Sequence, residues 1–193
     1  GGTITSDNQA IQNWNEATIS GGELTGLVYS WSAGADGSAE AGTLTISGNA
    51  KITGNVYAVQ YKYDNIEPTK AATVKIEGGT IIGTVSTATS GYGTGESPTT
   101  SANMTVSGGN FSSSVREEFL AEELTAELYS TSKNSQAPYS YYVSVSAALE
   151  DAKAGDTVVD LTAQQGTEKY TVTLRYGNGE ADTTYTELAA GTT

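Results

Sequence analysis

The sequence predicts a mainly β protein, with a short single-stranded parallel β-helix of about four to five coils that ends in a capping helix and precedes a small α+β segment. Three observations support this prediction: the composition, a recurring glycine-containing motif, and apolar residues that form columns when the copies of the motif are aligned. Of the 193 residues, 23 are Gly, 3 are Pro and 16% are charged, and Ser, Thr and Tyr are abundant. This composition favours strands and turns over helices.

A motif with an apolar residue, one or two glycines and a second apolar residue recurs through the first part of the chain. Its leading glycines are 20, 27, 30 and 30 residues apart. Self-similarity at such a period is typical of a solenoid, in which each copy forms one coil. The closing part of a motif lies at 1–4, and full motifs lie at 19–24, 46–52, 76–81 and 106–111.

Apolar residues occupy four aligned columns in these copies. Because side chains alternate sides along a strand, apolar residues two positions apart point inward together. One coil cannot bury its own apolar side, but coils stacked ~4.8 Å apart bury a continuous ladder. The columns are Ala17/Leu44/Val74/Met104, Ile19/Ile46/Ile76/Val106, Ile4/Leu24/Ile52/Ile81/Phe111 and Val28/Val56/Val85/Val115.

Glycines stand between the apolar columns, where we expect the chain to turn corners that a Cβ would obstruct. Gly26, Gly54 and Gly83 follow the third column by two residues, and Ser113 takes this place in the last copy. The alternative fold is an ordinary β-sandwich with repeated turns. A sandwich would place turn signals every ~8–12 residues, whereas most of these copies recur after 27 to 30 residues.

The coils resemble the right-handed parallel β-helix of the pectate-lyase-like superfamily. They are more closely similar to the "TISGG-x-I-x-G" coils in large surface proteins of gut-associated Gram-positive bacteria. The resemblance covers residues 1–129 and implies a right-handed coil in an extracellular, cell-surface or secreted protein. Lyases, adhesins and passive stalks all carry such coils, so the fold does not select among these functions.

A helical pattern follows the last copy of the motif. Serines at 112–114 offer an N-cap, and acidic residues in the first turn suit the helix dipole. We expect this helix to cover the open end of the β-helix, because an exposed sheet edge invites aggregation. The residues with helical spacing are Val115, Phe119, Leu120, Leu124 and Leu128.

Residues 130–193 are expected to form a linker and a small α+β or β-grasp-like segment. The phrase AALEDAKAGDTVVDL at 147–161 resembles segments that open or join coils in the same class of surface proteins. The end of the chain resembles the start of an internalin-type B repeat, although the chain stops before such a module would be complete. The expected pieces are a linker at 130–138, a strand at 141–145, a helix at 146–153, a turn at 154–157, and strands at 158–161, 170–176 and 183–188.

Composition also excludes several kinds of chemistry. The chain has no Cys and no His, so thiolate catalysis, a Ser-His-Asp triad and the common zinc sites are excluded. Nine Lys and Arg stand against 22 Asp and Glu, and the net charge of −13 argues against nucleic acid and anionic membranes as partners. No apolar run approaches the ~20 residues of a membrane span. We expect a monomer without a cofactor.

One loop contains the residue types that a pectate lyase would use. Lys62, Asp64, Glu67 and Lys70 fall together between two copies of the motif, and loops often carry function. Carboxylates at Asp64 and Glu67 could bind calcium, but the ligand spacing of a dedicated site is missing. A solvated loop is the simpler interpretation, and we assign no catalytic residue and no metal ligand. A pair of carboxylates for glycoside hydrolysis stays open, since such pairs meet only in three dimensions.

Aromatic residues are the candidates for ligand binding. Tyr57, Tyr61 and Tyr63 share one side of a strand-like run, and Trp31 falls near the same place one coil earlier, together with Tyr29. Stacked rings can hold sugar rings, whereas aligned rings also stabilise a parallel sheet by packing. Both interpretations stay open. The candidate ligand-binding residues are Trp31, Tyr57, Tyr61, Tyr63 and Asp64.

These patterns predict a non-catalytic module for adhesion or display, or a spacer, in a bacterial cell-surface or secreted protein. The alternative is a carbohydrate-binding module, and a polysaccharide lyase or hydrolase is the third candidate. The expected partners are host or plant glycans, or a host surface protein. The chain begins at Gly1 without an initiator Met or export signal, so we expect it to be a processed or excised piece.

Overall fold

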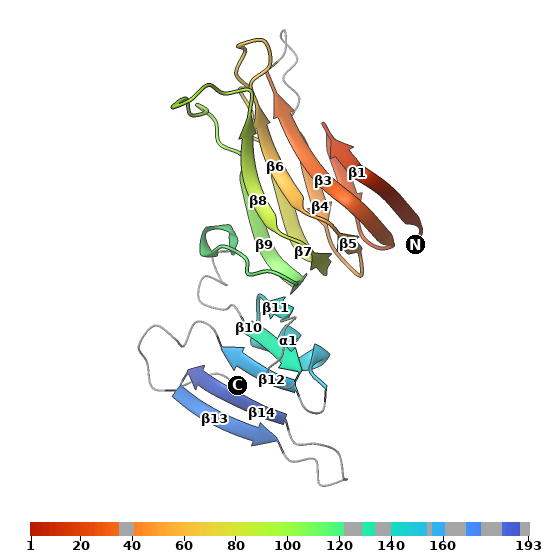
Figure 1. Cartoon of the computed structure of the whole chain (residues 1–193), viewed down its shortest axis with the longest axis vertical. Helices are drawn as coiled ribbons and strands as arrows, with labels where there is room; N and C mark the ends of the chain where they lie inside the picture. The colour runs from red at the N-terminus through yellow and green to blue at the C-terminus, as the bar shows by residue number, and fades with distance from the viewer. Residues whose placement is uncertain are drawn as a thin grey trace.

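The computed structural model describes residues 1–34, 41–121, 129–133, 140–153, 156–160, 169–174 and 183–189. Its larger part is a β-solenoid of about three turns, built from parallel strands, with the small C-terminal segment at one end (Figure 1). The predicted parallel β-helix is therefore confirmed. None of the helices in these ranges is long and apolar enough to cross a membrane.

Three parallel sheets form the walls of the solenoid. The first contains β2 (Glu16–Ile19), β4 (Thr43–Ile46) and the beginnings of β7 (Thr73–Ile82) and β9 (Asn103–Phe111). The second contains the beginnings of β1 (Thr3–Asn13) and β3 (Glu23–Ala33), then β5 (Lys51–Thr53) and the ends of β7 and β9. The third contains the ends of β1 and β3, then β6 (Val56–Tyr61) and β8 (Val85–Ser90).

The strand pairing confirms the register that the columns predict. Ile19 pairs with Ile46, Ile46 with Ile76, and Ile76 with Val106. Leu44, Ile52 and the column residues of the later coils form one continuous core, and Ile46, Ile76 and Val106 are fully buried, whereas Ile4 in the first coil is 45% exposed. Three copies of the motif contribute to all three sheets, whereas the first and the last contribute to two each. This explains why about three turns arise from five copies.

A stack of glycines forms the corner between the second and third sheets. Gly26 and Gly54 have φ values of +124° and +149°, in a region that residues with a Cβ rarely adopt. A Cβ on Gly54 would collide with the carbonyl oxygen of Gly26 in the preceding coil, and a Cβ on Gly83 would collide with that of Gly54. The close approach of successive coils therefore depends on glycine here.

The end of the solenoid is covered differently from the expectation. The predicted capping helix is one 3₁₀ turn (Glu117–Phe119) in its described part, which ends at Ala121, and residues 122–128 lie outside the described residues. Val115, Phe119 and Leu120 are nevertheless buried in the core. Ala121 donates its backbone N–H to the Val106 carbonyl at 2.9 Å, so this segment still closes the last coil.

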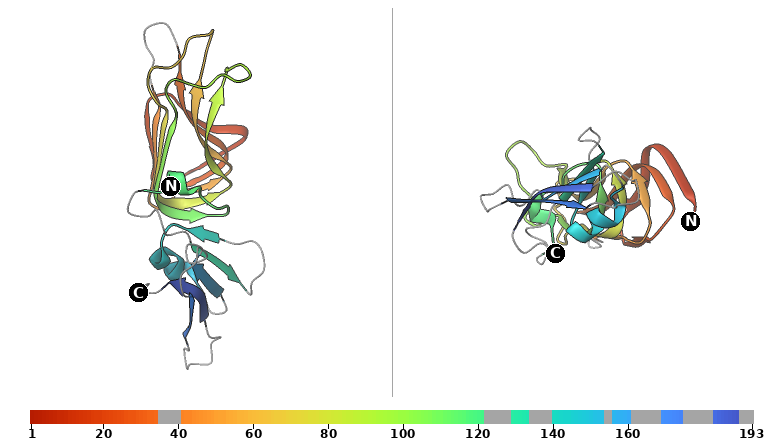
Figure 2. Two further views of the ribbon diagram at one scale, coloured as in Figure 1. Left: turned by 90° about the vertical axis from the view of Figure 1, so that its left-hand side faces the viewer. Right: turned by 90° about the horizontal axis from the view of Figure 1, so that it is seen from below.

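The C-terminal segment continues the second sheet in antiparallel fashion. It contains a helix, α1 (Val145–Asp151), capped by the Ser144 hydroxyl, which accepts from the backbone N–H of Ala147 at 3.2 Å. Val143 joins the solenoid core, so this segment packs on the end of the coils (Figure 2). The strands are β10 (Tyr129–Lys133), β11 (Ser140–Tyr142), β12 (Asp156–Asp160), β13 (Lys169–Leu174) and β14 (Thr183–Ala189), and β11 pairs with β9.

Predictions for this segment are wrong at three places. The strand expected at 141–145 ends at Tyr142, and the turn expected at 154–157 gives way to β12 at Asp156. The linker expected at 130–138 begins with strand β10, which lies between β11 and β12 and pairs with both. Serine and threonine dominate β10, and such residues suit both loops and strands, so tertiary pairing decides. The rest of that linker lies outside the described residues.

Candidate functional site

The outward side of the third sheet carries the aromatic residues. Along β3, Val28, Ser30 and Ser32 are buried in the solenoid, while Tyr29 and Trp31 alternate with them on the outer side. The next coil repeats this pattern, with Tyr57 paired to Tyr29 and Tyr61 paired to Ala33. Successive coils therefore bring aromatic side chains from different repeats together on one outer surface.

Six rings form one continuous group, which we call the aromatic cluster. Trp14 stacks on Trp31 with ring centroids 5.6 Å apart, and Tyr29 stacks on Tyr57 at 5.5 Å, each pair with an interplanar angle of 20°. Trp31 meets Tyr61 edge-on at 5.4 Å. The cluster consists of Trp14, Tyr29, Trp31, Tyr57, Tyr61 and Tyr63.

The rings differ in how much of each is free for a ligand. A stacked pair turns one face of each ring toward its neighbour, and Trp31 and Tyr61 are only partly exposed. Trp14 is 40% exposed and Tyr63 is 50% exposed, and they stand at opposite ends of the series Trp14, Trp31, Tyr61, Tyr63. The free ring surface is therefore concentrated at the two ends of the cluster.

Neighbouring side chains fix the cluster in place. The amide nitrogen of Asn55 donates to the Tyr57 hydroxyl at 3.0 Å, and its amide oxygen accepts from the backbone N–H of Thr84 in the next coil at 2.9 Å. Burial, with the nearby Tyr57 hydroxyl, raises the pKa of Tyr29. Rings held in this way lose little conformational freedom when a ligand binds.

Tyr63 enters the cluster from a tight turn. Its backbone N–H donates to the Ile66 carbonyl at 3.2 Å, and the Ile66 N–H donates to the Tyr63 carbonyl at 2.8 Å. The two residues between them, Asp64 and Asn65, have φ values of +49° and +62°, which Asp and Asn tolerate better than other residues with a Cβ. Asp64 is thus exposed at the tip of the turn, next to Tyr63.

Buried polar groups hold the base of this loop. The Gln60 amide nitrogen donates to the Lys70 carbonyl at 2.8 Å, and the Gln60 amide oxygen accepts from the Ala72 backbone N–H at 3.2 Å. The Ser32 hydroxyl donates to the same Lys70 carbonyl at 2.6 Å. Gln60 and Ser32 are fully buried, so the loop backbone is fixed to the inner side of the sheet whose outer side carries the rings.

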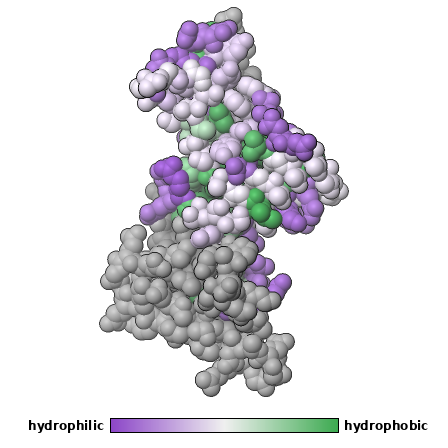
Figure 3. All heavy atoms as spheres, in the orientation of Figure 1, coloured by the Kyte–Doolittle hydropathy of each residue, from purple (hydrophilic) through white to green (hydrophobic). Residues whose placement is uncertain are grey.

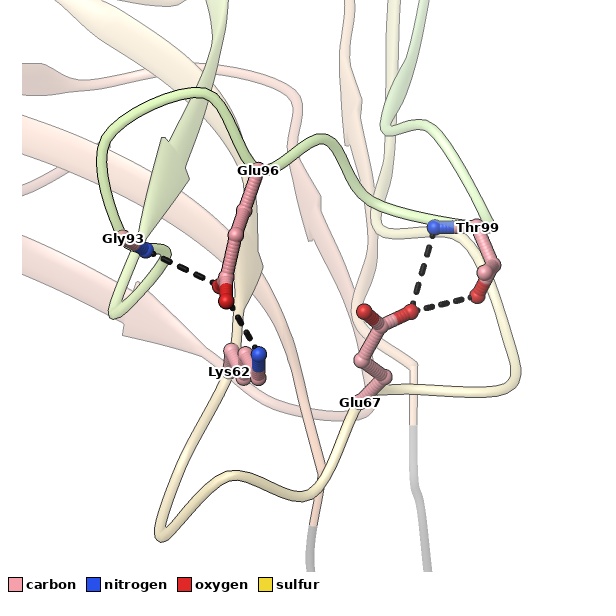
Figure 4. A network of polar contacts seen from close by, with 5 residues as sticks. All are labelled: Lys62, Glu67, Gly93, Glu96 and Thr99. Carbon is pink, nitrogen blue, oxygen red and sulfur yellow. Dashed lines mark hydrogen bonds and ion pairs between the residues drawn. The ribbon is translucent and has the colours of Figure 1, made fainter.

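A second polar network joins this loop to the loop of the next coil (Figure 4). Lys62 and Glu96 form an ion pair at 2.8 Å, and Glu96 also accepts from the Gly93 backbone N–H at 3.0 Å. Glu67 accepts from the backbone N–H and the hydroxyl of Thr99, at 3.2 and 2.6 Å. Both loops are therefore tied together by charged hydrogen bonds.

These contacts decide the protonation of the residues that a lyase would need. The hydrogen bonds from Thr99 lower the pKa of Glu67, and those from Lys62 and Gly93 lower the pKa of Glu96. The hydrogen bond to Glu96 raises the pKa of Lys62. At neutral pH the two carboxylates are therefore ionised hydrogen-bond acceptors, and the Lys62 amine is protonated. Across the described ranges, no three acidic side chains gather as ligands for a metal ion.

The structure brings most of the predicted ligand-binding residues together. Trp31, Tyr57, Tyr61 and Tyr63 lie in the aromatic cluster, and Asp64 adjoins it. Sequence reasoning missed Trp14. The solenoid surface visible in Figure 3 is mostly of intermediate hydropathy, with hydrophobic residues scattered singly. A hydropathy pattern alone therefore gives no sign of a binding surface on that side.

No family model, curated protein or solved structure matches this chain. The resemblances to bacterial β-helix coils and to internalin-type repeats therefore stay predictions, and the function is argued from the site itself.

Proposed function

We propose that this chain is a non-catalytic module of a bacterial cell-surface or secreted protein, and that it binds carbohydrate on the aromatic cluster. The observation that carries the proposal is the pair of free ring surfaces, on Trp14 and Tyr63, at the two ends of a fixed group of rings. Aromatic faces attract the C–H groups of sugar rings, while the sugar hydroxyls stay in water. Adhesion to a glycan surface follows from such a site.

The absence of catalysis is supported by the state of the two glutamates in the loop network. Glu67 accepts hydrogen bonds from Thr99, and Glu96 accepts them from Lys62 and Gly93. Glycoside hydrolysis needs one carboxyl group that keeps its proton near neutral pH. A lowered pKa at both glutamates is the opposite of that requirement.

The test is a panel of insoluble polysaccharides, scored in the same tubes for retention of the protein and for release of product. We expect retention without product. Trp14→Ala and Tyr63→Ala should each reduce retention, whereas Ile82→Ala should not, because Ile82 is 43% exposed but lies on the second sheet. Release of reducing ends or unsaturated sugars would overturn the non-catalytic assignment, and equal retention of all three variants would overturn the assignment of the site.

A spacer is the second candidate, because one specific observation favours it. Strand β11 pairs with β9 at the edge of the second sheet, and Val143 joins the same core, so the C-terminal segment is attached directly to the solenoid. A protein with this property can hold attached parts at a fixed distance. Failure of every polysaccharide to retain the folded protein would favour the spacer over the binding module.

A further inference from the structure

The proposed carbohydrate site has a shape and a charge that narrow its ligand. We propose, on the basis of that function, that the aromatic cluster takes an extended, uncharged oligosaccharide that touches Trp14 and Tyr63 at its two ends. The inference has two independent parts, the length of the ligand and its lack of negative charge. They are supported by different residues.

The length follows from the placement of the free rings. Trp14 lies beside Trp31 of the second coil at 5.6 Å, Trp31 lies beside Tyr61 of the third coil at 5.4 Å, and Tyr61 lies beside Tyr63 at 5.8 Å. Neighbouring strands are ~4.8 Å apart, so the coils that carry the two end rings are on the order of 10 Å apart. One sugar ring reaches only one of the free surfaces, whereas a chain of several sugars reaches both.

The inner rings support the same conclusion. Trp31 and Tyr61 are half-buried and meet edge to face, so each offers a ligand less surface than the end rings do. Val59 points to the same side, pairs with Trp31 and is 3% exposed, so the outer side of the sheet is covered by side chains at this point. A ligand therefore gains most from the exposed end rings, Trp14 and Tyr63, and less from the rings between them.

The preference for a ligand without negative charge follows from the charged groups around Tyr63. Asp64 is exposed at the tip of the same turn, and Glu67 and Glu96 lie in the loop network beyond it. The Lys62 ammonium is paired with Glu96 at 2.8 Å, and its side chain is only 13% exposed. The Lys70 backbone carbonyl accepts from Ser32 and Gln60 on the inner side of the sheet, while Lys70 itself is exposed.

An anionic sugar would thus approach the exposed Asp64 carboxylate, beside a Lys62 ammonium that is already paired, on a chain whose net charge is −13. Uronic acids, sialic acids and sulfated sugars are disfavoured by this field. A neutral glycan is unaffected, because its hydroxyls need only hydrogen-bonding partners and water.

The test compares neutral oligosaccharides with their uronic acid counterparts by isothermal titration calorimetry on the full chain. Glucan, mannan and galactan oligosaccharides of one to six units are paired with glucuronan, mannuronan and galacturonan fragments of equal length. We expect affinity to rise with length up to about four units and then level off. Each uronate should bind at least about tenfold more weakly than its neutral partner at low salt, with the gap closing near 1 M salt, where the screening length is ~3 Å.

Each part of the inference has its own refutation. A monosaccharide that binds as tightly as the tetramer would overturn the extended ligand, and a uronate that binds as tightly as its neutral partner would overturn the charge argument. Either result would leave carbohydrate binding itself in place. If no oligosaccharide of either kind binds, the proposed function fails and the inference fails with it.

Variants at the ends of the cluster separate contact from charge. Trp14→Ala and Tyr63→Ala should each weaken tetramer binding about three- to tenfold and flatten the dependence on length, whereas Tyr63→Phe should keep both. Asp64→Asn should narrow the gap between the neutral sugar and the uronate, measured as the ratio of their two affinities in the same variant. An unchanged ratio in Asp64→Asn would show that this carboxylate does not set the charge preference.

Discussion

Replacing Gly54 by alanine tests how closely the coils stack. Gly54 lies in the middle of the glycine corner, between Gly26 of the preceding coil and Gly83 of the next coil, and has a φ of +149°. The added Cβ would meet two separate obstacles. One is the backbone conformation, and the other is the carbonyl oxygen of Gly26.

The magnitude is the sum of these two effects. A residue with a Cβ in a sparsely populated backbone region costs about 1–3 kcal/mol. Forcing extra volume into a closely packed place costs a further ~1–3 kcal/mol. We therefore expect Gly54→Ala to lower the free energy of unfolding by about 4 kcal/mol, a large share of the ~5–15 kcal/mol that typical domains have.

Two matched glycines separate the effects. Gly95 has a φ of +81°, but nothing lies within 4 Å of the position of its Cβ, so Gly95→Ala carries the conformational cost alone. We expect it to cost no more than about 1–2 kcal/mol. Gly2 has open space as well and no positive φ, and Gly2→Ala should be neutral.

The assay is urea unfolding followed by far-ultraviolet circular dichroism, with the midpoint and the slope fitted separately. A shift of the midpoint at constant slope reports stability. If Gly54→Ala is no more destabilising than Gly95→Ala, the close contact between Gly54 and Gly26 does not constrain the solenoid. The corner would then tolerate ordinary residues, and its glycines would need another explanation.

Three further results are expected. Ile76→Ala should cost about 2–5 kcal/mol in urea unfolding, because Ile76 is fully buried, while the exposed Ile82→Ala should stay within ~0.5 kcal/mol; similar costs would contradict the core assignment. Gln60→Ala should cost about 1–3 kcal/mol, because it leaves the buried Ala72 N–H without its acceptor; a neutral result would show that this bond is dispensable. The Glu96 pKa is lowered from 4.5, so its contribution to the loop network is present above that pH and is lost as the pH falls through the lower value. The Gly93 amide shift in nuclear magnetic resonance should change in that acidic window, and Glu96→Gln should abolish the change.

The solenoid could be predicted because the spacing of the repeated motif and the pattern of apolar residues indicate the same fold. Each column, such as Ile19, Ile46, Ile76 and Val106, combines a fixed position in the motif with an apolar side chain. A one-residue slip would turn every one of these side chains outward, so the register is strongly determined. The parts that lacked a repeat, the end of the solenoid and strand β10, are the parts where the structure differs from the expectation.

Trp14 shows why half of the candidate site escaped sequence reasoning. It follows β1, whose pairing with β3 shifts register between Thr5 and Gln9 and again between Gln9 and Ile11. The first two motifs are nevertheless only 20 residues apart instead of 27 to 30, because two residues, Trp14 and Asn15, join β1 to β2. No column of the alignment therefore places Trp14 beside Trp31.

The packing and the binding interpretations of the aromatic residues are compatible, because they concern different surfaces of the same cluster. A stack across coils consumes the ring faces inside it, as Tyr29 and Tyr57 do, and this contributes to the sheet. A finite group must still end, and the rings at its two ends, Trp14 and Tyr63, are the most exposed of the cluster. In this solenoid the coil after Tyr57 and Tyr61 carries Ser86 and Ser90 at the paired positions, so that coil adds no further ring there. Packing therefore fixes the inner rings, and the rings at the two ends of the cluster, Trp14 and Tyr63, stay exposed for a ligand.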